Sequence, residues 1–137
     1  MSARPGERFA PVAPELFVRD VDASIRFYED ALGFEVWRRE EHDGSADFAV
    51  LVRGDAHFLL QHERLATGGA PAGHRGAGID IRVMVDDVDR VYERASAAGA
   101  QIARPIGDRD YGLRDFKVHD PDGFVIRFAQ PLAVHRD

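Results

Sequence analysis

Residues 18–36 read VRDVDASIRFYEDALGFEV, and residues 85–102 repeat the same pattern as VDDVDRVYERASAAGAQI. Val18, Asp20, Val21 and Asp22 of the first stretch each have an identical residue 67 positions later (85 − 18 = 67). Gly33 and Gly99, which follow the helices expected in the two stretches, are 66 positions apart (99 − 33 = 66). A fixed offset across most of the chain is the signature of an internal repeat. The chain therefore contains two copies of one structural unit.

Each copy predicts the same order of elements. An alternating strand comes first, at 15–18 and again at 78–85, and Asp20 or Asp87 then stands at a helix N-cap position. Apolar residues follow at helical spacing, and Gly33 or Gly99 ends the helix. Three more strands are expected per copy, at 34–41, 46–53 and 56–62, then at 101–105, 113–119 and 123–129. The prediction is an α+β fold of two tandem βαβββ modules.

The modules are expected to form one domain, because 137 residues suffice for one compact core. The first module spans 14–63 and the second 78–130. A glycine- and alanine-rich connector at 64–77 is expected to be flexible. An N-terminal arm at 1–13 and a C-terminal tail at 131–137 complete the chain.

The composition excludes several classes of function. The chain has no cysteine, so it has neither disulfides nor thiolate metal sites. Its net charge of −6 opposes nucleic-acid binding and is compatible with a cationic ligand. No apolar run is long enough to span a membrane, and the N-terminus shows no secretion signal. The expected location is the cytoplasm.

Strand alternation sorts side chains into a helix-covered face and an open face. In 78–85 and 123–129 it turns Asp80, Arg82 and Arg127 toward the open face. The 67-residue offset extends this face to the first module. The residues expected there are Glu15, Phe17, Phe58, Leu60 and His62. An ordinary solvent face remains the alternative, but the aromatic and aliphatic residues favour a ligand cavity.

Three further aromatic residues are candidates for ligand contact. Alternation turns Trp37, the only tryptophan, toward the cavity, with Phe48 on the next strand and Tyr111 at the cavity mouth. Flat walls of this kind suit a planar aromatic or cationic molecule. Packing of Trp37 in a dimer interface is nearly as good an explanation. Glu15 and His62 are the only candidates for a catalytic base, and binding roles are favoured for both.

The segments PELFVRDVDASIRFYEDALGFEV (14–36) and YGLRDFKVHDPDGFVIRFAQ (111–130) resemble the opening and closing segments of bleomycin-resistance proteins. These belong to the vicinal oxygen chelate superfamily, which also contains glyoxalase I and extradiol dioxygenases. The resemblance implies two βαβββ modules with mixed sheets curled around a cavity, in a homodimer. It also implies metal-ligand positions on the first and last strand of each module, which map to Ala13, Leu60, Asp80 and Arg127.

These four positions form a poor ligand set. Ala13 and Leu60 have no donor atom, and the guanidinium of Arg127 repels a divalent cation. Only Asp80 is competent, so neither a metal nor another cofactor is expected. Asp80 and Arg127 are expected to form an ion pair, either purely structural or available to hold a charged group of a ligand.

The sequence therefore favours a metal-independent protein of the bleomycin-resistance type. It would sequester a small cationic or planar aromatic molecule in a dimer crevice. The alternative is an enzyme of the same superfamily, either a metal-dependent lyase or dioxygenase or one that uses Glu15 or His62 as a base.

Overall fold

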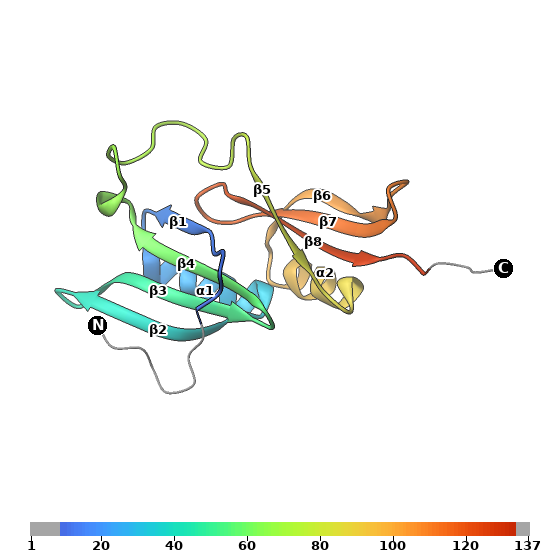
Figure 1. Ribbon diagram of the computed structural model, residues 1–137, viewed down its shortest axis with the longest axis horizontal. Helices are drawn as coiled ribbons and strands as arrows, with labels where there is room; N and C mark the ends of the chain where they lie inside the picture. The colour runs from blue at the N-terminus through green and yellow to red at the C-terminus, as the bar shows by residue number, and fades with distance from the viewer. Residues whose placement is uncertain (1–8, 134–137) are drawn as a thin grey trace. The chain divides into compact units, whose positions relative to one another are not determined.

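The computed structural model describes residues 9–133, which form two α-helices, eight strands and one 3-10 turn (Figure 1). Within this range no helix has the length and apolar character that a membrane crossing requires. Residues 1–8 of the predicted arm and 134–137 of the predicted tail lie outside the described part. The described residues divide into two compact units, one built from 9–29 with 34–71, the other from 30–33 with 72–133.

The first unit is a four-stranded mixed sheet with the strand order β1-β4-β3-β2. Strand β1 runs parallel to β4, and the other neighbours are antiparallel. Its elements are β1 (Glu15–Val18), α1 (Val21–Leu32), β2 (Glu35–His42), β3 (Ser45–Arg53), β4 (Ala56–His62) and η1 (Glu63–Leu65).

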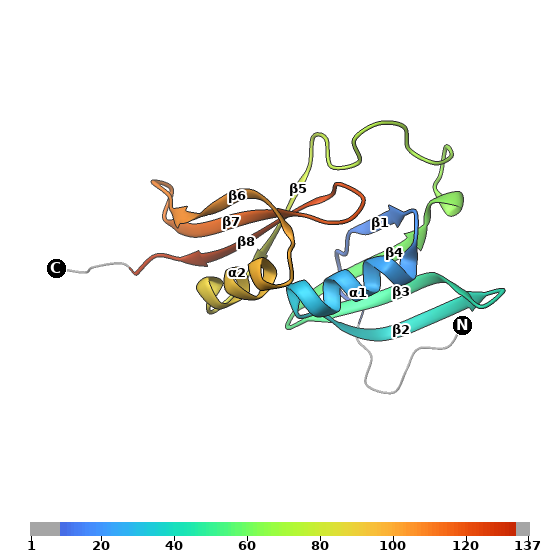
Figure 2. The same ribbon diagram turned by 180° about the vertical axis from the view of Figure 1, so that it is seen from behind.

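The second unit repeats this arrangement, with the strand order β5-β8-β7-β6 and the parallel pair β5 and β8. Its elements are β5 (Asp80–Met84), α2 (Val88–Ala97), β6 (Gln101–Asp108), β7 (Leu113–His119) and β8 (Val125–Pro131). The predicted α+β fold with two mixed sheets is confirmed. Each sheet has a helix of its own unit beside it (Figure 2).

The helix ends are built by the residues that the sequence indicates. A carboxylate oxygen of Asp20 accepts a hydrogen bond from the amide of Ala23 at 3.0 Å, and Asp87 accepts one from Arg90 at 3.2 Å. These bonds satisfy first-turn amides that have no partner inside the helix. Gly33 and Gly99, with φ of 75° and 77°, take the left-handed conformation that stops each helix.

An aromatic cluster joins α1 to the first sheet. The ring of Tyr28 on α1 meets Phe34 and Phe58 edge-on, at centroid distances of 5.5 and 5.8 Å. Leu60 is fully buried on the same face, in register with the buried Leu16. The prediction that Phe58 and Leu60 point to the open face is therefore wrong, because both pack beneath the helix.

The error comes from the length of one turn. Four residues separate Val52 of β3 from its partner His57 of β4, whereas five separate the equivalent His119 of β7 from its partner Val125 of β8. Glu15 pairs with Leu59, and its repeat equivalent Arg82 pairs with Arg127. On the last strand of each unit the offset is therefore 68 rather than 67 (127 − 59 = 68), and Leu59 is the structural equivalent of Arg127.

Part of the connector is docked onto the second unit rather than free. Arg75 forms an ion pair with Asp122 at 3.1 Å, and both side chains are almost fully buried. The backbone beside Arg75 lies close to the turn before β8, since a Cβ added to Gly76 would meet the carbonyl oxygen of Gly123 at 2.2 Å. The expectation of a uniformly flexible connector therefore fails at 75–76.

Replacing Leu60 and its neighbour Leu59 by alanine tests the orientation of β4. We expect Leu60→Ala to lower the free energy of unfolding by about 2–5 kcal/mol, because it leaves a cavity beneath α1. Leu59→Ala removes the same atoms from a half-buried position, so we expect it to lower the free energy of unfolding by only about 1 kcal/mol. Urea denaturation followed by circular dichroism measures both. A larger loss for Leu59→Ala would show that β4 has the opposite orientation.

Candidate functional site

The face of the first sheet opposite α1 is mainly apolar. Trp37 lies there, since its ring meets that of His57 at 5.3 Å and His57 alternates with the helix-facing Phe58. His57 is buried. Register and alternation place on this open face the apolar or aromatic residues Phe17, Trp37, Phe48, Val50, Val52, His57 and Leu59 and the polar or charged residues Glu15, Glu35, Arg38, Glu40 and Gln61. Of the predicted ligand-binding residues, Phe17, Trp37 and Phe48 are therefore brought together.

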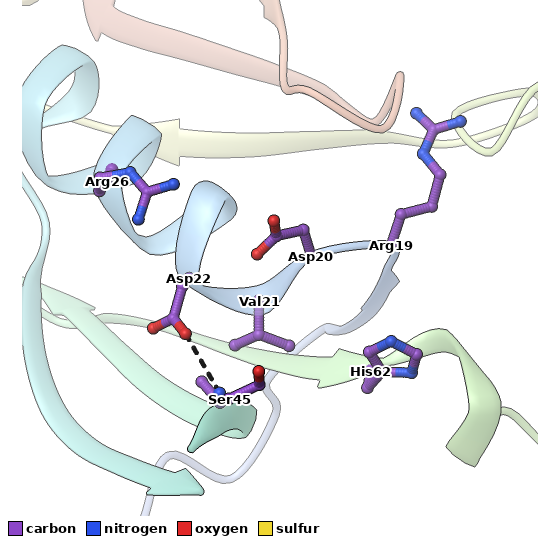
Figure 3. Close-up of a pocket in the computed structure, with 8 residues that line it drawn as sticks. Arg19, Asp20, Val21, Asp22, Arg26, Ser45 and His62 are labelled. Carbon is purple, nitrogen blue, oxygen red and sulfur yellow. Dashed lines mark hydrogen bonds between the residues drawn. The ribbon is translucent and has the colours of Figure 1, made fainter. Parts of the chain in front are cut away.

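His62 lies elsewhere, on the helix side of the sheet. It lines a polar pocket of about 410 Å³ at the N-terminal end of α1, together with Arg19, Asp20 and Arg26 among others (Figure 3). Its Nδ1 accepts a hydrogen bond from the amide of Arg64 at 3.1 Å. The expectation that His62 shares a cavity with Glu15 is therefore not met, because β4 turns them to opposite faces.

The carboxylates of this pocket are already used by the fold. Asp22 accepts hydrogen bonds from Arg39 at 2.9 Å and from the amide of Ala46 at 3.1 Å. The hydrogen bond from Arg39 is the main cause that lowers the pKa of Asp22, against a smaller opposing effect of burial. Asp20 caps α1. These contacts hold α1 against β2 and β3. The carboxylates of the pocket therefore have a role in the fold.

The open face of the second sheet is polar and charged. Arg127 on β8 stands in register between Arg82 on β5 and Lys117 on β7, so three cations form a row across three strands. Lys117 pairs with Asp80 at 2.6 Å. The predicted ion pair between Asp80 and Arg127 is therefore wrong, because the register places Asp80 beside Val125 and leaves its carboxylate to Lys117.

A buried carboxylate organises this face. Asp115 on β7 has no exposed surface and accepts hydrogen bonds from Arg109 Nε at 2.7 Å and from the Tyr111 hydroxyl at 2.6 Å. Arg127 Nε lies 3.7 Å from the same carboxylate, too far for a hydrogen bond. Neither Asp115 nor Arg109 was a predicted site residue. The signal for Asp115 was available, because Phe116 belongs to the helix face and alternation turns Asp115 away from it.

Asp115 stays ionised despite its burial. Burial is the largest single influence and raises its pKa. The hydrogen bonds from Tyr111 and Arg109 and the charges of Arg109 and Arg127 together outweigh it, so the pKa of Asp115 lies below its ordinary value. One buried negative charge is thus shared by two guanidinium groups and a phenol.

Tyr111 connects this cluster to the surface. Its ring is half exposed, and Arg127 Cζ lies 5.6 Å from the ring centroid, within the range of a cation–π contact. The hydroxyl is held by Asp115, so the ring has a fixed position beside the cation. Tyr111, Arg82, Asp80 and Arg127 are therefore brought onto one face, as predicted.

The metal-ligand positions implied by the family resemblance do not fit a metal ion. With the offset corrected, they are Ala13, Leu59, Asp80 and Arg127. Leu59 lacks a donor atom as Leu60 does, Asp80 is engaged by Lys117, and Arg127 is cationic. Between residues 9 and 133 no cluster of three histidine, cysteine or acidic residues could hold a metal. A stable site needs several convergent donors.

Sequence and structural comparisons identify known proteins that are similar to this chain over most of its length. Residues 8–128 match the family model described as the Glyoxalase/Bleomycin resistance protein/Dioxygenase superfamily. A lactoylglutathione lyase of Haemophilus influenzae is 30% identical over 118 residues, which cover 84% of this chain and 87% of the lyase. A bleomycin resistance protein of Geobacillus stearothermophilus is 31% identical over 133 residues, covering 87% and 95%. The crystal structure of TioX from Micromonospora sp. ML1 superposes with a TM-score of 0.76 at 28% identity, covering 88% and 98%.

Replacing Asp115 by asparagine tests its role as a buried anion. We expect a loss of about 3 kcal/mol in the free energy of unfolding at neutral pH, the lower end for removing one partner of a buried ion pair. Because folding lowers the pKa of Asp115, this difference is fully present above the unfolded-state pKa of about 3.9. It disappears as the pH falls through the lower folded-state pKa. Urea denaturation of both proteins at a series of pH values measures it.

Asp80→Asn is the matched control, because it removes a carboxylate of the same face whose ion pair is partly exposed. We expect it to cost less than about 1 kcal/mol. Equal losses for the two variants, or a difference for Asp115→Asn that grows at acid pH, would contradict the assignment.

Proposed function

Because the chain belongs to the Glyoxalase/Bleomycin resistance protein/Dioxygenase superfamily, we propose that it binds and sequesters a small, partly aromatic molecule without metal-dependent chemistry. The proposal applies to the open faces of the two sheets. It does not involve the pocket beside α1, whose carboxylates stabilise the fold.

The nature of the implied coordination positions carries the proposal. Metal-dependent chemistry in this superfamily requires electron-pair donors on the first and last strands. This chain instead has two aliphatic side chains, Ala13 and Leu59, one carboxylate bound by a lysine, and the cation Arg127. No step of a metal-dependent lyase or dioxygenase reaction can be assigned to these side chains.

The first open face supplies the surface that such a ligand would contact. Phe17, Trp37 and Phe48 lie on it with several aliphatic residues. Polar groups come from Glu15 and Gln61 and, along the edge strand β2, from Glu35, Arg38 and Glu40. Apolar and aromatic walls with few polar groups are typical of small-molecule sites. The relative from Geobacillus stearothermophilus that matches over most of this chain is a bleomycin resistance protein, which supports the proposal. We expect the site to be completed in a homodimer, as the family resemblance implies.

The similarity to lactoylglutathione lyase favours an enzyme as the second candidate. Such an enzyme would need Glu15 as the base, since His62 faces the other side of the sheet. Turnover of the hemithioacetal of methylglyoxal and glutathione that is lost in Glu15→Gln would establish it and exclude simple sequestration.

Native mass spectrometry of freshly purified protein tests the metal-independent function. After incubation with Ni²⁺, Zn²⁺ or Co²⁺ and buffer exchange, we expect dimers that carry well below one metal ion per subunit. The thermal midpoint is expected to be unchanged by a chelator. One tightly held transition ion per subunit, with Asp80 among its ligands, would contradict the proposal.

Trp37 provides a direct probe of ligand binding, because it is the only tryptophan. Titration with planar aromatic antibiotics or with bleomycin is expected to change its fluorescence and raise the thermal midpoint. We expect Phe48→Ala to weaken binding of an active compound about tenfold through lost stacking. Leu65→Ala is the control, since it removes an exposed side chain from η1. No response to any compound, or equal effects of both variants, would contradict this site.

A further inference from the structure

The second open face contains more positive than negative charge. Arg82, Arg127 and Lys117 form its transverse row, and Arg109 adds a fourth cation beside Asp115. Among residues 9–133 only two carboxylates, Asp80 and Asp115, form ion pairs with this group. The excess is notable in a chain whose net charge is −6. This face is therefore locally positive, although the chain as a whole carries a net negative charge.

Arg127 lies at the centre of the row and has unused hydrogen-bonding capacity. Its Nε is buried and has no hydrogen-bond partner among the described residues, although its side chain is 21% exposed. Asp115 lies too far away to accept from it and already accepts from Arg109 and Tyr111. A buried donor without an acceptor is costly and rare in folded proteins. The buried Nε itself is out of reach of a ligand, so an anion would meet the exposed part of this guanidinium.

Arg82 adds a second guanidinium at the adjacent strand position. Within residues 9–133 its side chain makes no ion pair or hydrogen bond, and it is exposed on β5. Like charges directly opposite each other on neighbouring strands are unfavourable. An anion placed between Arg82 and Arg127 would relieve this repulsion. Guanidinium groups bind carboxylates through paired, charge-assisted hydrogen bonds.

Apolar surface lies next to the row. Met84 follows two residues after Arg82 on the same face and is 45% exposed, and the ring of Tyr111 is 50% exposed. Both are large side chains that folding leaves partly in water. A ligand whose anionic end meets the guanidinium pair can place its apolar body against these two side chains.

We propose that the open face of the second sheet binds the carboxylate of an aromatic ligand between Arg82 and Arg127. The assignment rests on the proposed function, since it takes sequestration as the role of this face and names the chemical class of a molecule that would be bound there. A singly charged, planar group is favoured because the ionised Asp115 behind Arg127 opposes a higher negative charge. Met84 and Tyr111 contact the aromatic ring.

Binding of benzoate, measured by calorimetry and by the thermal midpoint, tests this site. We expect benzoate to bind in the millimolar range and to raise the midpoint, whereas benzamide, its neutral analogue of the same shape, does neither. Inorganic phosphate is expected to bind more weakly than benzoate, because it lacks the apolar body. Equal effects of benzamide, tighter binding of phosphate, or no effect of benzoate would overturn the proposal.

Two arginine variants locate the site. We expect Arg82→Gln to weaken benzoate binding about tenfold by removing a charge-assisted contact. Arg90→Gln removes the same charge from the exposed surface of α2 in the same unit, and benzoate binding is expected to be unchanged. Neither side chain supports the core, so both variants are expected to fold. Equal binding by the two variants would overturn the site.

Failure of the carboxylate site can be distinguished from failure of the proposed sequestration function. A neutral compound that changes Trp37 fluorescence and binds equally well to Arg82→Gln would overturn the carboxylate site and leave sequestration intact. Benzoate binding that depends on Arg82, together with metal-dependent turnover, would retain the anion site and overturn sequestration.

Discussion

Side chains alternate between the two faces of each sheet, and a helix covers one of these faces. Together these two constraints determine whether a strand residue packs in the core or lies on the open face. Once α1 covers the face that carries Leu16, Phe58 and Leu60, every intervening residue of those strands belongs to the opposite face. The same constraint acts in the second unit. The helix-covered faces are mainly apolar cores, so the proposed ligand sites are on the open faces.

Much of the fold follows from the sequence because it depends on local physical chemistry. The aspartate caps, the glycine stops and the helical spacing of apolar residues lie within single elements, and the repeat shows that they occur twice. The orientation of β4 could not be obtained in this way. It depends on a turn whose length differs between the copies, and a change of one residue moves every side chain of a strand to the other face. Asp55 and Asp122 match in the sequence, yet they stand at different distances from their strands.

The ion pairs of the second unit depend on contacts across three strands. Asp80 and Arg127 lie on neighbouring strands, and their proximity was correctly inferred. Their pairing was not, because Lys117 on the third strand reaches Asp80 at 2.6 Å and Asp115 attracts Arg127. Such competition is not visible when only the first and last strands of a module are considered. The open-face aromatics Phe17, Trp37 and Phe48 were easier to identify, since each depends only on alternation within its own strand.

The charge at the position of Arg127 decides which ligands the second unit can accept. A carboxylate there would attract a divalent cation, whereas a guanidinium reverses the sign of the local field and attracts anionic oxygens. The buried Asp115 keeps this change compatible with folding, because it offsets part of the positive charge without exposing itself to a ligand. It does not provide Arg127 Nε with a hydrogen bond. The fold therefore stabilises the arginine electrostatically, and the proposed carboxylate would contact the exposed part of its guanidinium rather than the buried Nε.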